Sequence, residues 1–106
     1  MGATLDLIQI AVAAGQRMLS DHAFDRLLEN AILVGEVAAG LAAAVEIEDY
    51  PDAFKGPSVL VLQTDAAGRP IHVVWGLRKG TTTPAILVTA YRPDPARWSS
   101  DFRRRL

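Results

Sequence analysis

At Val45 the hydrophobic pattern of this 106-residue chain changes its period, and that change constrains the fold more than any other feature. Before Val45, apolar side chains recur at the spacing of amphipathic helices. After Val45 they alternate, or run together over short segments bounded by glycine and proline, which is typical of β-strands. We therefore expect an α+β fold, with N-terminal helices packed on a mainly antiparallel twisted sheet of about four strands.

Three helices are expected in the first part of the chain. The first covers Thr4 to Met18, and Thr4 can cap its N-terminus. Gly15 either lowers the stability of this helix from inside or ends it early. The second begins after a cap at Ser20 or Asp21. The third covers Ile32 to Ala44. Its inward side chains are expected to be Val34, Val37, Ala38 and Leu41.

The second helix has two different faces. Its apolar residues follow the spacing of a core-facing stripe: Phe24, Leu27, Leu28 and Ala31. The opposite face carries His22, Arg26 and Glu29, with His22 and Arg26 one turn apart. The residues alone leave open whether this polar face is an ordinary solvated surface or part of a site.

Four strands are expected from Val45 onward. The segments are Val45 to Asp49, Ser58 to Thr64, Arg69 to Leu77 and Ala85 to Arg92. Short connections join the last three, so we predict that these three strands are adjacent and antiparallel. The helices are expected on one face of the resulting meander.

The strand that starts at Arg69 carries a histidine among apolar residues. Alternation places Ile71, Val73 and Trp75 on one face, and His72 and Val74 on the other. An imidazole is costly to bury without a hydrogen-bond partner. We therefore expect His72 either to be satisfied by a neighbouring group or to line a cleft.

The composition excludes several classes of protein. The chain has no cysteine, so neither a disulfide framework nor a thiolate zinc site is possible, which fits a reducing, cytoplasmic compartment. Two histidines and scattered carboxylates offer no convincing spacing for a metal ion, and we expect no cofactor. No apolar run is long enough to cross a membrane, so no membrane contact is expected.

The charge is unevenly divided along the chain. Residues 1–53 sum to 2 − 9 = −7, whereas residues 54–106 sum to 9 − 3 = +6. One interpretation is a local positive surface formed by the second half. The other is that the two halves pair with each other after folding.

Five segments in order resemble a bacterial family known as a domain of unknown function. The segments are Ser20–Leu27, Ile32–Val37, Glu48–Pro51, Gly68–Val74 and Thr89–Trp98. Their motifs include S-x-H-A-x-x-R, G-R-P-x-H-V-V and Y-R-P-D-P-x-x-W. That family is similar to the small toxin ribonucleases of toxin–antitoxin pairs, the group of RelE-like and motility-quorum-sensing-regulator-like toxins.

The resemblance implies a single RelE-like toxin-type domain over residues 1–106 that cleaves RNA without a metal. It also implies a partner antitoxin, since members are often encoded beside a small zinc-finger antitoxin. The other partner we expect is a second copy of the chain. One position departs from the family pattern, because many relatives carry an arginine where this chain has Asn30. Asn30 cannot supply a positive charge to a phosphate.

RNA cleavage without a metal needs a base for the 2′-hydroxyl proton, an acid for the leaving 5′-oxygen, and cations near the phosphorane. A histidine can do either proton-transfer step near neutral pH. We therefore predict that the catalytic residues are His72, His22 and Tyr91. Tyr91 is included because it ends the strand expected to pair with the one that carries His72.

Arginine suits phosphate because its guanidinium is planar and always charged. The predicted phosphate-binding residues are Arg26, Arg92 and Arg78. The alternative interpretation is a catalytically inactive module of the same fold that binds a protein or RNA. Single residues also have other interpretations: His72 as a satisfied core residue, Tyr91 and Trp98 as packing residues, and Arg103 to Arg105 as a solvated tail.

Overall fold

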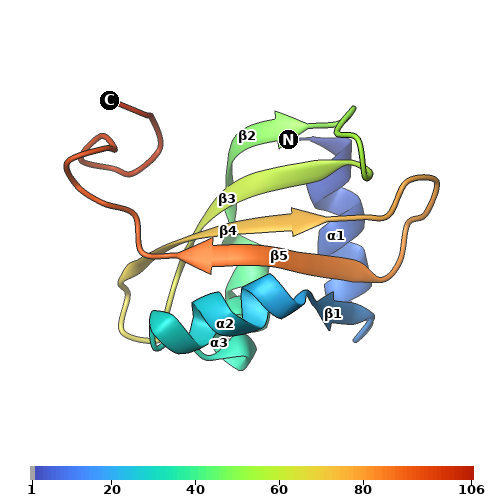
Figure 1. The fold of residues 1–106 in the computed structure, drawn as a ribbon, viewed down its shortest axis with the longest axis horizontal. Helices are drawn as coiled ribbons and strands as arrows, with labels where there is room; N and C mark the ends of the chain where they lie inside the picture. Colours follow the sequence, from blue (N-terminus) through green and yellow to red (C-terminus); the bar gives the residue numbers. More distant parts are fainter. Residues whose placement is uncertain (1) are drawn as a thin grey trace.

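The computed structural model describes residues 2–106, in which three α-helices pack on a five-stranded sheet (Figure 1). The helices are α1 (Ala3–Ala13), α2 (Asp21–Glu29) and α3 (Val34–Gly40), and α3 continues into a 3-10 turn, η1 (Leu41–Ala43). The strands are β1 (Arg17–Leu19), β2 (Val45–Tyr50), β3 (Ser58–Thr64), β4 (Pro70–Gly76) and β5 (Ala85–Tyr91). The predicted α+β class is confirmed.

The sheet has the strand order β1-β5-β4-β3-β2. The pairs β2–β3, β3–β4 and β4–β5 are antiparallel, so the predicted adjacency of the last three strands is confirmed. The β3–β4 connection is a tight turn in which Gly68 has a positive φ of 81°. Asp65 closes this turn, because its Oδ1 accepts hydrogen bonds from the backbone N–H groups of Ala67 and Arg69, each at 2.9 Å.

The first predicted helix is too long, and its last part forms a strand. Helix α1 ends at Ala13 because Gly15, with φ of 76°, turns the chain and lets the Gln16 N–H bond the Ala11 carbonyl. The next residues form β1, which runs parallel to β5 and makes a fifth strand. The predicted cap is also wrong, since Gly2 occupies the N-cap and Thr4 lies buried inside the helix.

Helix α2 begins where predicted but is rotated about its axis. Ser20 is the N-cap: its Oγ accepts from the Ala23 N–H at 3.0 Å and donates to the Val88 carbonyl at 2.9 Å. This cap fixes the helix start to β5, and Ala23 and Leu27 form the buried stripe. The prediction that Phe24, Leu28 and Ala31 face the core is therefore wrong. All three are exposed.

The main core lies between the sheet and the helices α1 and α3. Ile71, Val73 and Trp75 all project into it, as the alternation predicts. Helix α3 is joined to the sheet by a buried chain of hydrogen bonds, in which Trp75 Nε1 donates to Gln63 Oε1 and Gln63 Nε2 donates to the Val37 carbonyl. Gly40 is needed at this contact, because a Cβ there would lie 3.1 Å from Gln63 Nε2 and from the Thr64 carbonyl oxygen.

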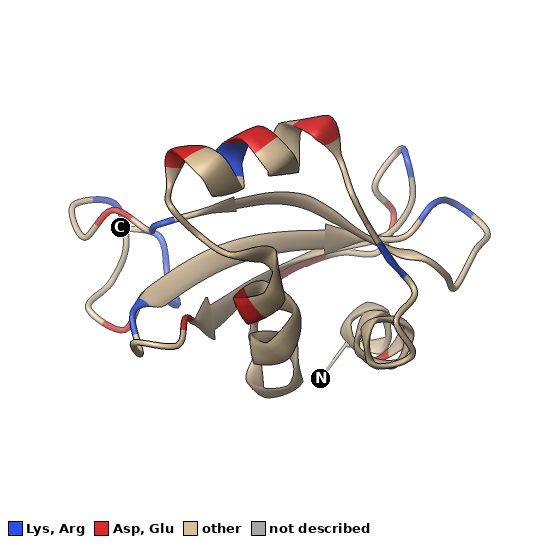
Figure 2. Cartoon of the chain, turned by 90° about the horizontal axis from the view of Figure 1, so that it is seen from below, with Lys and Arg blue, Asp and Glu red and all other residues tan. Residues whose placement is uncertain are grey.

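The helices do not all share one face of the sheet. α1 and α3 lie on one side, whereas α2 runs along β5 on the side away from them (Figure 2). The third predicted helix, Ile32 to Ala44, is shorter in the structure because Ala31 has a positive φ of 53° and the last turn is 3-10. Within residues 2–106, no helix is long and apolar enough to cross a membrane.

Candidate functional site

His72 lies on the face of β4 that points away from α1 and α3. It stands opposite Leu62 on β3 and Tyr91 on β5, and its exposed fraction is 0 %. The edge of its ring packs against Trp98, with 4.3 Å between ring centroids, and against Tyr91 at 5.3 Å. The histidine is therefore enclosed by aromatic rings.

Both ring nitrogens of His72 have hydrogen-bond partners. Nε2 lies 2.8 Å from the carbonyl oxygen of Phe102, which can only accept, so Nε2 carries the proton. Nδ1 lies 3.2 Å from the Tyr91 hydroxyl and accepts from it in the neutral ring. Burial lowers the pKa of His72 below its ordinary value, although the hydrogen bond to Phe102 opposes this shift. His72 is thus a neutral base that faces a phenol.

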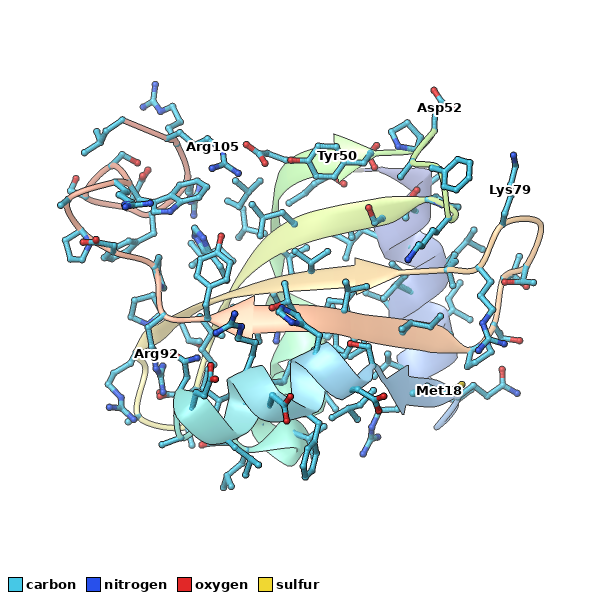
Figure 3. The ribbon with its side chains drawn as sticks, viewed as in Figure 1. Met18, Tyr50, Asp52, Lys79, Arg92 and Arg105 are labelled. Atoms are coloured by element: carbon cyan, nitrogen blue, oxygen red, sulfur yellow. The ribbon has the colours of Figure 1, made fainter. Side chains whose placement is uncertain are left out.

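The cover over His72 is the C-terminal tail, defined here as residues 93–106. Trp98 is 5 % exposed, and the guanidinium of Arg105 lies 4.7 Å from the centroid of its ring. Arg105 also reaches β2, where its Nε and Nη2 donate to the two carboxylate oxygens of Glu48 at 2.8 and 3.0 Å. Figure 3 shows Arg105 pointing toward the strand that carries Tyr50.

Glu48 is the anchor for this tail. Its hydrogen bond with Arg105 is the main cause that lowers the pKa of Glu48 to about 2, and the Tyr50 hydroxyl, which also donates to this carboxylate, adds to the effect. The carboxylate is therefore ionised throughout the ordinary pH range. A charged pair with two parallel hydrogen bonds holds the tail against β2.

Arg92 directly follows β5 and lies beside the β3–β4 turn. Its Nη2 lies 2.9 Å from Asp65 Oδ2, and its Nη1 donates to the Pro70 carbonyl at 3.3 Å. Arg69 binds the same carboxylate oxygen at 3.0 Å. Backbone N–H donation from Arg69 is the largest cause that lowers the pKa of Asp65. Two guanidinium groups share one carboxylate, so one positive charge remains uncompensated at this corner.

A groove of about 620 Å³ opens between the end of β5 and the tail. It is lined by Tyr91, Arg92, Asp94, Ala96, Arg97, Trp98, Arg105 and Leu106. A larger hollow, of about 800 Å³, lies between α1 and α3, but Asp6 is the one charged residue in its lining. The smaller groove is the candidate site because it combines three arginines with the hydroxyl of Tyr91.

The structure brings three of the six predicted site residues together. Tyr91 and Arg92 line this groove, and His72 lies buried behind Tyr91, to which its Nδ1 is hydrogen-bonded. Arg78 lies beyond the other end of β4, about 20 Å from His72 by the length of the intervening strand.

The remaining two predicted residues lie on the exposed face of α2. Arg26 Nε donates to His22 Nε2 at 3.5 Å, and Arg26 forms an ion pair with Glu29 at 2.6 Å. Neither side chain contributes to the lining of the groove. Among residues 2–106, no cluster of three or more metal-binding side chains is present.

A family model described as a domain of unknown function, DUF4258, matches residues 19–92. The chain belongs to the DUF4258 family. No curated protein and no solved structure matches it. The DUF4258 segment contains β2 to β5 with His72, Tyr91 and Arg92, whereas the tail that covers His72 follows it.

Several residues that build the site were not predicted from the sequence. The sequence predicts no role for Glu48 and only packing for Trp98, and one interpretation places Arg105 in a solvated tail. Arg105 instead connects the tail to the DUF4258 segment. Asn30 follows α2 as its C-cap and donates from Nδ2 to the Arg26 carbonyl at 2.8 Å. It serves as a helix cap in this chain.

The charge segregation of the sequence largely survives folding. Carboxylates gather along α2, and lysines and arginines gather in the tail and in the loops at the sheet ends (Figure 2). Of the five ion pairs within residues 2–106, Arg105–Glu48 alone joins the two halves of the chain. Ion pairing between the two halves is therefore limited to this one contact, which favours the interpretation of a local positive surface formed by the second half.

Proposed function

We propose that this chain is a toxin-like, metal-independent endoribonuclease of a bacterial toxin–antitoxin pair that acts in the cytoplasm. The observation that carries the proposal is Tyr91, which lines an arginine-rich groove and whose hydroxyl lies 3.2 Å from Nδ1 of the neutral His72. Residues 92–106 contain five arginines and two aspartates, a formal 5 − 2 = +3, which favours a polyanionic ligand such as RNA.

In this proposal Tyr91 contacts the RNA, and His72 accepts a proton from Tyr91 without contacting the RNA. Tyr91 receives the proton of the 2′-hydroxyl while its own proton moves to Nδ1 of His72. The 2′-oxygen then bonds to phosphorus and the bond from phosphorus to the 5′-oxygen breaks. The same pair returns the proton to the 5′-oxygen, so the products are a 2′,3′-cyclic phosphate and a 5′-hydroxyl end.

The arginines of the groove supply the positive charge for the phosphorane. Arg92 is held in place by Asp65 and by the Pro70 carbonyl, so its position is fixed before RNA binds. Arg97 is exposed and lies 4.0 Å from Asp94, a separation that leaves its guanidinium available to a phosphate. Arg92 therefore orients the reacting phosphate, and Arg97 binds the chain beside it.

A second function is favoured by a different observation. His72 is fully buried and both of its nitrogens are occupied, which is the environment of a structural histidine. The second candidate is therefore an inactive module of the same fold that binds RNA or a protein through the groove. Its arginines would contact phosphates without proton transfer.

The deciding experiment is cleavage of a long RNA in EDTA, with and without ribosomes, by wild type and Tyr91→Phe. The phenylalanine keeps the packing against His72 and removes only the hydroxyl. We expect it to lower the cleavage rate by about 10²–10⁴-fold, the usual contribution of a proton-transfer group. The matched control is His22→Gln on the exposed face of α2, which should cut at the wild-type rate.

Two results would contradict the endoribonuclease. If folded Tyr91→Phe cleaves RNA at the wild-type rate, the Tyr91 hydroxyl does not transfer a proton in the reaction. RNA binding by the wild type without any cleavage would favour the binding module instead. Circular dichroism of each variant establishes that a loss of activity is not a loss of folding.

The proposed toxin is held inactive by an antitoxin encoded beside it, of the small zinc-finger type. This proposal rests on the family resemblance. We expect the product of the adjacent gene to co-purify with the chain and to suppress RNA cleavage. Light scattering of the chain alone gives its molar mass, which shows whether two copies of the chain associate instead. A monodisperse monomer that does not bind the adjacent gene product would contradict both partners.

A further inference from the structure

Helix α2 exposes two of its three large apolar side chains. Phe24 is 56 % exposed and Leu28 is 66 % exposed, although both belong to a nine-residue helix that packs on β5. The two residues are four positions apart, so they form one continuous apolar strip on the helix surface. Within residues 2–106 the sheet contacts α2 instead through the neighbouring stripe of Ala23 and Leu27.

A row of carboxylates runs beside this apolar strip. Asp21, Asp25 and Glu29 recur every four residues, on the side of the strip away from the buried stripe. Glu29 is paired with Arg26, whereas Asp21 and Asp25 form no ion pair within the described residues. The red segments along α2 in Figure 2 mark this row. The surface therefore combines apolar contact area with an acidic edge.

We propose that this surface of α2 binds a partner polypeptide through a basic amphipathic segment. The apolar side chains of that segment cover Phe24 and Leu28, and its lysines or arginines bind Asp21 and Asp25. A second copy of this chain that paired through the same helix would bring acidic row against acidic row, which disfavours self-association. The charge thus selects a basic partner.

The α2 surface and the proposed RNA groove are separate. The groove is lined by residues 91–106 and by no residue of α2. The proposal therefore does not depend on ribonuclease activity. A chain that fails to cleave RNA can still bind the partner segment, so the two proposals fail independently.

The test is a titration of the full isotope-labelled chain with a synthetic peptide, followed by NMR. The peptide is an amphipathic helix about four turns long, with leucines on one face and lysines on both flanks. We expect saturable shifts confined to α2, and weaker binding when salt is raised from roughly 50 to 500 mM, because screening reduces the attraction between exposed charges.

Matched variants assign the binding to named side chains. Phe24→Ala with Leu28→Ala should weaken binding by about tenfold or more, since it removes the apolar contact area. Asp21→Asn with Asp25→Asn should abolish most of the salt dependence. The control is Ile10→Ala, which removes another exposed apolar side chain, on α1, and should bind the peptide as the wild type does.

Three outcomes would overturn the proposal. The first is equal binding of a peptide whose lysines are replaced by glutamates, because the acidic row would then have no part in recognition. The second is a set of shifts that falls on the hollow between α1 and α3, or on the arginine-rich groove. The third is a wild-type dimer in light scattering that the double alanine variant dissociates, which would assign the surface to a second copy.

Discussion

A histidine placed between a carbonyl oxygen and a phenol is restricted to one neutral tautomer. In His72 the carbonyl of Phe102 fixes the proton on Nε2, and the Tyr91 hydroxyl then has to donate to Nδ1. Protonation of the ring would place a second N–H against that hydroxyl and would charge a group that water does not reach. The folded state therefore disfavours protonation of His72.

This restriction predicts a pH dependence of stability. The pKa of His72 is lower in the folded chain than in the unfolded chain, so below about pH 6.5 the unfolded state binds more protons. The free energy of unfolding should therefore fall as the pH is lowered from about 7 to 5, a range above the transitions of the carboxylates. Urea unfolding at several pH values measures this change in the free energy of unfolding.

The matched comparison is between the two histidines. In His72→Gln the free energy of unfolding should no longer fall between about pH 7 and 5. In His22→Gln, a change on the helix surface, it should fall as in the wild type. A slope that persists in folded His72→Gln would assign the pH dependence to another group.

The ion pair between Glu48 and Arg105 predicts how the tail is held. Glu48→Gln removes the charge that binds Arg105, so the tail should separate from β2 and expose Trp98. Tryptophan emission should shift to longer wavelength and become more sensitive to acrylamide quenching. Asp94→Asn is the control, because its partner Arg97 is already solvated. Unchanged quenching in Glu48→Gln would mean that the packing of Trp98 alone holds the tail.

Among the elements, α2 shows why a hydrophobic pattern can indicate a helix without fixing its orientation. The helix carries two apolar stripes, Ala23 with Leu27 and Phe24 with Leu28, about 100° apart around the axis. The larger side chains favour the second stripe in a prediction. The Ser20 cap on β5 selects the first, because the small Ala23 side chain permits close approach to the strand.

This orientation gives opposite expectations for two adjacent leucines. Leu27 is 5 % exposed, so Leu27→Ala should lower the free energy of unfolding by about 2–5 kcal/mol. Leu28→Ala removes the same atoms from the surface and should change it by about 0.5 kcal/mol or less. Chemical denaturation of both variants measures the difference, and equal losses would refute the orientation of α2.

Strands β3, β4 and β5 could be predicted because their alternation and their short connections are local properties of the sequence. β1 could not, because three residues carry no periodicity and its partner lies far away in the chain. The same limit applies to the site. Alternation predicted the face of His72, whereas the contacts of Phe102, Trp98 and Arg105 depend on how the tail folds back.

In the whole molecule, negative charge gathers along α2, and positive charge lies in the tail and in the loops at both ends of the sheet (Figure 2). The arginines of the tail differ in role. Arg105 is engaged with Glu48 and Trp98, whereas Arg103 and Arg104 are exposed. Removing the whole tail would therefore also uncover His72, and it is not a clean test of charge.

The double variant Arg103→Ala with Arg104→Ala removes positive charge from the tail without uncovering His72. If both arginines contact phosphates, RNA affinity should fall and the slope of log K against log salt should become shallower by about 1–2. Filter binding at several salt concentrations gives this slope. The matched control is Arg78→Ala with Lys79→Ala, which removes two charges beyond the far end of β4. An equal effect of the control pair would place the RNA elsewhere on the surface.

The pairing of β1 with β5 has a consequence for the order of events during synthesis. β1 precedes every other strand in the chain, yet its partner follows them all, and the Ser20 side chain bonds the Val88 carbonyl 68 residues away. On the ribosome, α1 and β1 emerge before strands β2 to β5, and β1 has no strand to join until β5 has left the exit tunnel. The nascent N-terminal segment must therefore remain unpaired while β2, β3 and β4 assemble, and its docking completes the sheet.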